Sequence, residues 1–173
     1  MTKELVAPTI LIRRMQPSEY AWALALNNSE VPHVSASADY KFPRFIESAA
    51  WAPVAVRDNK PVGFAVLFLA GSTYESENYR WVAARYSRFL YLDRIVIEPA
   101  HRGKGIGAAM YEQAIEFGRR RAPILTCEVN EDPPNPDSMR FHEKLGFREL
   151  GKQKTEGGKK SVVILGLDLN APG

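Results

Sequence analysis

The sequence predicts an α/β layered domain, built from a mixed, mostly antiparallel sheet with helices on both of its faces. Two observations carry this prediction. Short apolar runs of strand length alternate with segments of helical periodicity, and several of these runs are joined by turns of the hairpin type. The chain has 173 residues, 45% hydrophobic and 25% charged, which fits one globular domain over residues 1–173.

The N-terminal part is predicted as a strand followed by two helices. Residues 9–15 alternate apolar and polar side chains, which is typical of a half-buried strand. Pro17 then opens a helix, since proline is favoured in a first turn, and Asn27 and the asparagine after it end that helix. After a loop over 30–38, a second helix is expected over 38–50.

The next segment is predicted to form a hairpin and a third long strand. Two apolar runs, 54–56 and 62–69, are separated at 57–61 by turn-forming residues that include Asp, Asn and Pro. The stretch 70–84 is polar and aromatic with no clear period, so we expect an irregular connection there. Residues 89–97 form another strand-length apolar run, which ends at a Glu-Pro pair.

The C-terminal part is predicted as helix, strand, helix and hairpin. Apolar residues recur at helical spacing between Ile106 and Phe117, and 124–130 is a strand. Asn135 followed by proline starts a helix as a cap, and the glycine after Leu145 ends it. The closing hairpin pairs 147–150 with 161–169 around a glycine-rich turn, and 170–173 is a tail.

Composition excludes several classes of protein. The single cysteine, Cys127, rules out an internal disulfide framework, and we expect no metal site. The start of the chain lacks the apolar core of a signal peptide, and the longest apolar run, 62–70, is too short for a membrane helix. The net charge of +3 is compatible with an anionic ligand. We therefore expect a cytoplasmic protein without a membrane or nucleic-acid partner.

The most informative segment is the glycine-rich stretch 102–107, Arg-Gly-Lys-Gly-Ile-Gly, between a strand and a helix. Glycines allow the backbone to approach a ligand closely, and a helix start offers free N–H groups and a partial positive charge. Arg102 and Lys104 add formal charge. The pattern predicts a phosphate or pyrophosphate site; the alternative is a tight turn with solvated basic flanks.

Two other phosphate-binding folds match this segment less well. A Walker loop needs Gly-Lys followed by Ser or Thr, which no segment supplies. The dinucleotide fingerprint matches Gly103, Gly105 and Ala108, with Glu128 about 20 residues further on. That fingerprint follows its strand directly, however, whereas five residues intervene here after Ile97, and hairpin-linked strands precede the loop.

The stretch 95–107 resembles the acyl-CoA-binding motif of the GNAT superfamily of N-acyltransferases. In that motif Arg or Gln is followed by two residues, Gly, one residue, and Gly or Ala; Arg102, Gly105 and Gly107 occupy these places. The segment from Asn135 through Ser138, Phe141, His142 and Lys144 to Gly-Phe resembles the next helix of the family. The order of elements matches over nearly the whole chain.

The resemblance implies acetyl-CoA as cofactor. The pyrophosphate would sit on the amides of the glycine loop, and the pantetheine arm would lie along the end of the preceding strand. For Asn135 a pure capping role is an equal alternative. The predicted cofactor-binding residues are Ile95, Val96, Ile97, Arg102, Gly103, Lys104, Gly105, Ile106, Gly107, Asn135, Ser138, Phe141 and Lys144.

Transfer of an acyl group to an amine needs a base, an oxyanion site and an acid for the departing thiolate. We predict Asp93 as the base, because period-two alternation places it on the face of Ile95 and Ile97. The alternative is a surface ion pair with Arg94. For Glu128, on the adjacent strand, the simpler interpretation is a solvated or salt-bridged side chain.

His142 stands where the resemblance implies a tyrosine that protonates the coenzyme A sulfur. We predict His142 as a candidate acid, and a packed helix residue without catalytic duty is the alternative. Cys127 alternates with Leu125 and Val129 and is interpreted as a core residue rather than a nucleophile. The connections 71–86 and 27–40 are predicted to wall the acceptor pocket, although their aromatic residues could instead serve packing or a subunit contact.

The sequence therefore predicts an acetyl-CoA-dependent N-acetyltransferase that acts by direct attack of a primary amine in a ternary complex. The acceptor would be a small molecule or a peptide. A homodimer is compatible with the sequence, but no pattern requires it. Two other functions stay open: a non-catalytic coenzyme A-binding sensor or interaction module, and, less favoured, a dinucleotide-binding oxidoreductase.

Overall fold

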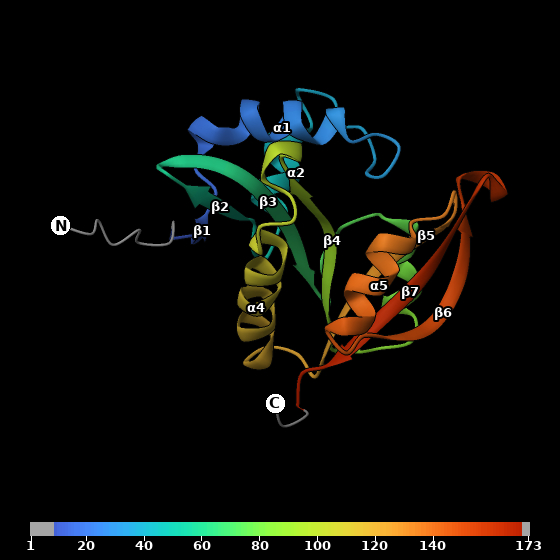
Figure 1. The fold of residues 1–173 in the computed structure, drawn as a ribbon. Coiled ribbons are helices and arrows are strands. Elements are labelled where there is room, and N and C mark those ends of the chain that lie inside the picture. Colours follow the sequence, from blue (N-terminus) through green and yellow to red (C-terminus); the bar gives the residue numbers. More distant parts are fainter. Residues whose placement is uncertain (1–8, 171–173) are drawn as a thin grey trace.

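A seven-stranded sheet in the order β1-β2-β3-β4-β5-β7-β6 forms the centre of the protein (Figure 1). The structure is a computed structural model that describes residues 9–170. Two predictions therefore concern residues outside the described part: the absence of a signal peptide at the start of the chain, and the last residues of the tail, 171–173. The strands are β1 (Leu11–Arg14), β2 (Pro53–Arg57), β3 (Lys60–Leu69), β4 (Leu90–Ile97), β5 (Ile124–Asp132), β6 (Arg148–Thr155) and β7 (Lys160–Asp168).

Helices cover both faces of this sheet, which confirms the predicted layers. The side chains of α1, α2 and α3 share one buried cluster with alternate residues of the strands, among them Phe64, Val66 and Phe68 of β3. Those of α4 share a second cluster with Ala65 and Leu67. The helices are α1 (Tyr20–Ser29), α2 (Phe42–Ser48), α3 (Glu77–Ala83), α4 (Ile106–Arg119) and α5 (Pro136–Lys144).

The sheet divides between β4 and β5. Every other pair of neighbouring strands is antiparallel and paired over much of its length, whereas β4 and β5 run parallel and pair only from Leu90 to Leu125 and from Tyr91 to Thr126. Both strands continue for several residues beyond this point, so they separate there and leave the facing edge of β4 unpaired. In Figure 1 β1 to β4 lie on one side of this division and β5 to β7 on the other.

A β-bulge interrupts β4 where the two strands separate. Leu92 pairs with Leu67 of β3 and Arg94 pairs with Val66, so Asp93 is the additional residue. A bulge reverses the alternation of side chains beyond it. Asp93 therefore does not share a face with Ile95 and Ile97, and the period-two argument for its orientation is wrong.

Several elements differ in extent from the prediction. The second helix is confined to Phe42–Ser48, and β6 extends to Thr155 rather than ending at 150. The stretch 70–84, predicted to be irregular, contains α3; the Ser76 hydroxyl caps this helix by accepting the N–H of Tyr79. Within residues 9–170, no helix is both long and apolar enough to cross a membrane.

Candidate active site

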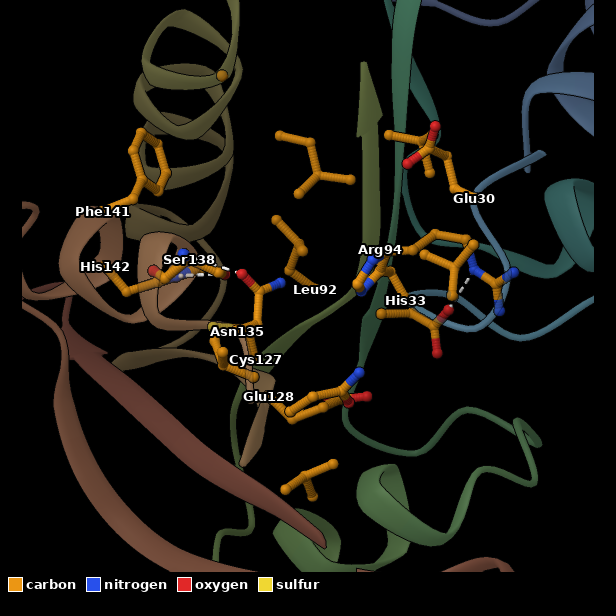
Figure 2. Close-up of a pocket in the computed structure, with 18 of the residues that line it drawn as sticks. Glu30, His33, Leu92, Arg94, Cys127, Glu128, Asn135, Ser138, Phe141 and His142 are labelled. Carbon is orange, nitrogen blue, oxygen red and sulfur yellow. Dashed lines mark hydrogen bonds and ion pairs between the residues drawn. The ribbon is translucent and has the colours of Figure 1, made fainter. Parts of the chain in front are cut away.

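A cavity of about 920 Å³ lies where β4 and β5 separate. In Figure 2 Glu30, His33 and Arg94 lie on one side of this cavity, and Phe141, Ser138 and His142 of α5 lie on the other. The glycine loop and the N-terminus of α4 line one end. The segment before α3 and the start of β7 line the other end. The division of the sheet therefore creates a cavity with two ends, one at the glycine loop and the other at α3 and β7.

The glycine loop leaves open space at the N-terminus of α4. Gly103 and Gly105 have φ values of +69° and +78°, which side-chain-bearing residues rarely adopt, and a Cβ on either would meet no atom within 4 Å. Gly105 is the N-cap of α4, a helix of 14 residues whose first N–H groups have no partner within the helix. Gly107 lies against Ile97 and Phe141. An anionic group can therefore reach the backbone here.

Most of the predicted cofactor-binding residues line the cavity, and two do not. Ile95, Val96, Ile97, Arg102, Gly103, Gly105, Ile106, Gly107, Asn135, Ser138 and Phe141 line the cavity. The two lysines do not. The Nζ of Lys104 turns back to the Ala100 carbonyl at 2.8 Å, and Lys144 is exposed at the end of α5, two residues beyond cavity-lining His142 and therefore on another face of the helix.

The loop and the strand edge fit the phosphate and the arm of an acyl-CoA. The open cradle at Gly103 and Gly105, the start of α4 and the guanidinium of Arg102 suit a pyrophosphate. The unpaired edge of β4 from Leu92 to Ile97 has free peptide groups, to which an amide-containing arm can add as a strand.

Arg102 is already engaged in an ion pair. One of its terminal nitrogens lies 2.7 Å from Glu30 Oε2, and its Nε donates to the Ile97 carbonyl at 3.1 Å. The side chain is half exposed, so the pair is screened by water. The guanidinium retains donors for a phosphate.

Asn135 both caps α5 and lines the cavity. Its side-chain oxygen accepts the N–H of Ser138 at 3.2 Å, as the capping interpretation predicts. Ser138 and Phe141 follow on the helix face that borders the same cavity. Asn135 thus holds the N-terminus of α5 in place, and Ser138 and Phe141 of this helix line the cavity.

His142 is buried among aromatic rings, and both of its ring nitrogens are hydrogen-bonded. Its Nδ1 lies 2.7 Å from the Ser138 carbonyl, which can only accept, so Nδ1 carries the proton. Its Nε2 therefore accepts from the hydroxyl of Tyr111 at 2.5 Å. Burial lowers the pKa of His142, which favours this neutral form. The arrangement leaves no free proton on His142 and favours the interpretation as a packed helix residue.

Asp93 is held by two donors at the bulge of β4. Its Oδ1 accepts from the hydroxyl of Tyr74 at 2.5 Å, and its Oδ2 pairs with Arg94 Nε at 2.7 Å. The Asp93 and Arg94 side chains are 5% and 9% exposed, so this is a buried ion pair rather than the surface pair considered from the sequence. Asp93 lines the cavity between these two donors.

Glu128 is the functional candidate that sequence reasoning underrated. Its Oε2 accepts from the hydroxyl of Tyr91 at 2.7 Å, and its Oε1 accepts from the Asn78 amide at 3.1 Å. Burial, and then the negative charge of Asp93, raise the pKa of Glu128 to about 8. Two carboxyl groups, from β4 and β5, thus face one cavity, and the pKa of one of them is raised. The only sequence signal was a glutamate inside an apolar strand.

Other side chains at the site are structural. Burial raises the pKa of the Cys127 thiol, so it is an unreactive core residue as predicted. Of the aromatic residues Tyr74, Tyr79, Trp81 and Tyr86 in the connection 71–86, which was predicted to wall the acceptor pocket, only Tyr74 lines the cavity. Tyr79, Trp81 and Tyr86 pack against the core cluster under α1 to α3.

The chain belongs to the GNAT acetyltransferase family. The sequence profile described as "Acetyltransferase (GNAT) family" matches residues 18–147, which is most of the chain. This confirms the resemblance found in the glycine loop and α5, and it displaces the dinucleotide-binding fold as an explanation of that loop.

Relatives in sequence include two bacterial proteins named peptidyl-lysine N-acetyltransferase YjaB. The one from Escherichia coli is 30% identical over 121 residues, which cover 70% of this chain, and the one from Salmonella typhimurium has the same identity and coverage of this chain. The matched region spans 64% and 65% of the two relatives, respectively.

Solved structures confirm the fold. The ribosomal-protein-S18-alanine N-acetyltransferase from Escherichia coli is 17% identical and superimposes with a TM-score of 0.71, covering 95% of this chain and 97% of the other. Arabidopsis thaliana Naa50, in complex with the bisubstrate analogue CoA-Ac-MVNAL, is 14% identical with a TM-score of 0.70, covering 92% and 98%.

Proposed function

We propose that this protein transfers the acetyl group of acetyl-CoA to a primary amine by direct attack in a ternary complex. One observation carries the proposal: the cavity between β4 and β5 joins an open anion cradle to the carboxyl groups of Asp93 and Glu128. Membership of the family and the names of the relatives, which acetylate peptidyl lysine, support the same reaction class.

The glycine loop and the edge of β4 would each bind a different part of acetyl-CoA. The amides around Gly103 and Gly105, together with Arg102, would hold the pyrophosphate, and the unpaired edge of β4 would hold the arm. When bound, acetyl-CoA supplies the acetyl group as a thioester. A backbone N–H on the β4 edge near Leu92 would donate to the carbonyl oxygen as negative charge develops there.

Glu128 would handle the proton of the acceptor. An alkylammonium cannot attack until it loses a proton, and a carboxylate whose pKa lies near 8 accepts one more readily than an ordinary carboxylate does. Tyr91 and Asn78 both donate to Glu128 and hold its carboxyl group in place. Asp93, fixed by Tyr74 and Arg94, would keep the proton affinity of Glu128 high.

The proton balance of the proposed reaction is simple. The acceptor nitrogen begins with three protons and ends, as an amide, with one. Of the two protons lost, Glu128 would pass one to the departing sulfur, and the other would go to solvent. Because both nitrogens of His142 are occupied, no step requires that residue.

The experiment compares wild type with Glu128→Gln in an assay of thiol release from acetyl-CoA. The amide keeps the size and an acceptor oxygen but cannot take a proton. We expect kcat/KM to fall by roughly 10²–10⁴-fold, with acetyl-CoA affinity within about twofold of wild type. Glu112→Gln, an exposed change on α4 outside the cavity, is the matched control.

The sensor function makes a different prediction. The absence of a free acid at His142 is the observation in its favour. A sensor would bind acetyl-CoA but release no thiol with any amine. Equal turnover in Glu128→Gln and wild type would instead refute the proposed role of Glu128.

A further inference from the structure

The strand β6 lies at one edge of the sheet, and one of its faces is in contact with α3. Side chains alternate along a strand, so Gly151, Gln153 and Thr155 share one face, and the exposed Lys152 and Lys154 share the other. Gln153 is half-buried on the face toward α3, and it does not line the cavity. A group on this strand can therefore act on the site only through another residue.

The helix α3 packs closely against this face of β6. A Cβ on Gly151 would lie 2.6 Å from the ring of Trp81, so any side chain at this position would push the helix away. Near the other end of the helix, the N–H of Glu156 donates to Glu77 Oε2 at 3.4 Å. These two contacts hold α3 on β6 near both of its ends.

Between these two contacts, a pair of amide side chains connects β6 to the proposed base. The Nε2 of Gln153 donates to Asn78 Oδ1 at 2.9 Å, and the Nδ2 of Asn78 donates to Glu128 Oε1 at 3.1 Å. An ionised carboxylate can only accept, so Asn78 must present its N–H to Glu128 and its oxygen to Gln153. If Gln153 did not donate, the Asn78 amide could turn over and place its oxygen against Glu128.

The orientation of the Asn78 amide matters because it affects how readily Glu128 releases its proton. A hydrogen bond donated to a carboxylate stabilises the charged form. Asn78 therefore acts against burial and against the charge of Asp93, which together raise the pKa of Glu128 to about 8. Loss of this donor would raise the pKa of Glu128 further.

The other titratable groups around Glu128 belong to other elements than β6. They are Tyr91, Asp93 and Arg94 of β4, Tyr74 before α3, Tyr111 of α4, and the neighbouring Cys127 of β5. Within residues 9–170, the side chain of Gln153 hydrogen-bonds to Asn78 and to none of these groups. A change at Gln153 therefore reaches Glu128 through Asn78.

We propose that Gln153 is a positioning residue for the reaction, which holds the Asn78 amide in the orientation that donates to Glu128. The edge strand β6 thus acts on the proposed base through α3, without contact with the cavity. The inference rests on the proposed function, because that function assigns Glu128 as the base.

The first test measures the protonation of Glu128 directly. A difference infrared titration follows the carboxyl band that is absent from Glu128→Gln. Gln153→Met keeps the length of the side chain and removes the donor, so the titration midpoint should rise by about 0.5–1 pH unit. Gln113→Met, the same change at an exposed glutamine of α4 outside the cavity, is the matched control and should keep the wild-type midpoint.

A double-mutant cycle tests whether Gln153 acts through Asn78. Asn78→Leu removes the donor that contacts Glu128 and should raise the midpoint by about one pH unit. In this variant Gln153→Met should have no further effect, because the amide that Gln153 positions is gone. Additive effects of the two changes would overturn the assigned route.

The kinetic test separates positioning from a purely structural role. The assay measures thiol release from acetyl-CoA with an N-terminally blocked lysine peptide, and its own ionisation is the same for every variant. At pH 7 we expect kcat/KM of Gln153→Met to fall about three- to tenfold, the consequence of a midpoint higher by 0.5–1 pH unit. At pH 10, where Glu128 is ionised in both proteins, kcat/KM should lie within about twofold of wild type.

Two results would overturn the inference: an infrared midpoint in Gln153→Met equal to that of Gln113→Met, or a loss of kcat/KM that is the same at pH 7 and pH 10. Neither result would affect thiol release by the wild-type protein, so the proposed function would stand. If wild type released no thiol with any amine, the proposed function would be overturned, and the infrared midpoint alone would decide whether Gln153 acts on Glu128. The two failures are therefore distinguishable.

Discussion

Asp93 and Glu128 show how two neighbouring carboxyl groups acquire different properties. Asp93 is surrounded by donors, the Tyr74 hydroxyl and the Arg94 guanidinium. Burial, and then the negative charge of Asp93, raise the pKa of Glu128 to about 8, although its two neutral donors, Tyr91 and Asn78, act in the opposite direction. Glu128 therefore exchanges its proton near neutral pH.

Asp93→Asn should lower the pKa of Glu128, because it removes a nearby negative charge while keeping an oxygen that accepts from Tyr74. For a base, kcat/KM rises with pH through its pKa, so the rising limb should move from near pH 8 toward lower pH by about one unit. The measurement is kcat/KM against pH, with Glu112→Gln as control. A limb that stays in place, or moves upward, would contradict the coupling.

His142→Phe should reduce stability more than turnover. The change leaves the buried Tyr111 hydroxyl without its acceptor, at a cost of about 1–3 kcal/mol in the free energy of unfolding. Because His142 donates no proton to the reaction, kcat should change by less than about threefold. Urea unfolding and thiol release measure the two effects.

The double variant Tyr111→Phe/His142→Phe supplies the control, since removing both partners should cost less than the sum of the single changes. A loss in kcat of about 100-fold or more in a folded His142→Phe variant would restore His142 as the acid.

At the scale of elements, local rules predicted most of the fold but not its irregularities. Asn135 as a cap and glycine at the exit of α5 were predictable because they depend on a few adjacent residues. The bulge at Asp93 was not, because it depends on the register between β3 and β4. The helix α3 was missed for a similar reason: it is stabilised by packing of Trp81 on Gly151, a contact distant in sequence.

Gly105→Ala should weaken acetyl-CoA binding by about tenfold or more, because a Cβ projects into the open space where the cradle meets its ligand. Gly71→Ala is the matched control: its φ of +82° is close to the +78° of Gly105, its Cβ also meets nothing, and it does not line the cavity. Both changes should cost about 1–2 kcal/mol of stability. Equal affinity of the two variants for acetyl-CoA would refute the role of the glycine loop in binding it.

At the scale of the whole molecule, sequence reasoning identified the family and the layers. It also named most of the residues that line the glycine-loop end of the cavity, because the glycine loop is a contiguous motif, and their role in binding the cofactor stays a prediction. The acceptor end could not be predicted in the same way. Its carboxylates come from segments that are far apart in sequence, such as Asp93, Glu128 and Glu156, and only the division of the sheet brings them to one cavity. The cytoplasmic location and the oligomeric state stay predictions.

Glu128 should also make the stability of the fold depend on pH. Its folded pKa is raised to about 8 from an ordinary value of 4.5, so between these pH values the folded state binds a proton that the unfolded state does not. Stability should therefore fall as pH rises through this window. Relative to Glu128→Gln, wild type should lose more than about 1.4 kcal/mol between about pH 5 and pH 8.5, the equivalent of one pKa unit. Urea unfolding of both proteins at the two pH values measures the difference; parallel behaviour would contradict the raised pKa.

The central claim is that the cavity between β4 and β5 binds acetyl-CoA. The most direct measurement is a calorimetric titration of the wild-type protein with acetyl-CoA, with NADH as the comparison ligand, at one salt concentration. The account predicts a dissociation constant in the micromolar range for acetyl-CoA and no detectable binding of NADH. Absence of acetyl-CoA binding, or equal binding of NADH, would contradict it.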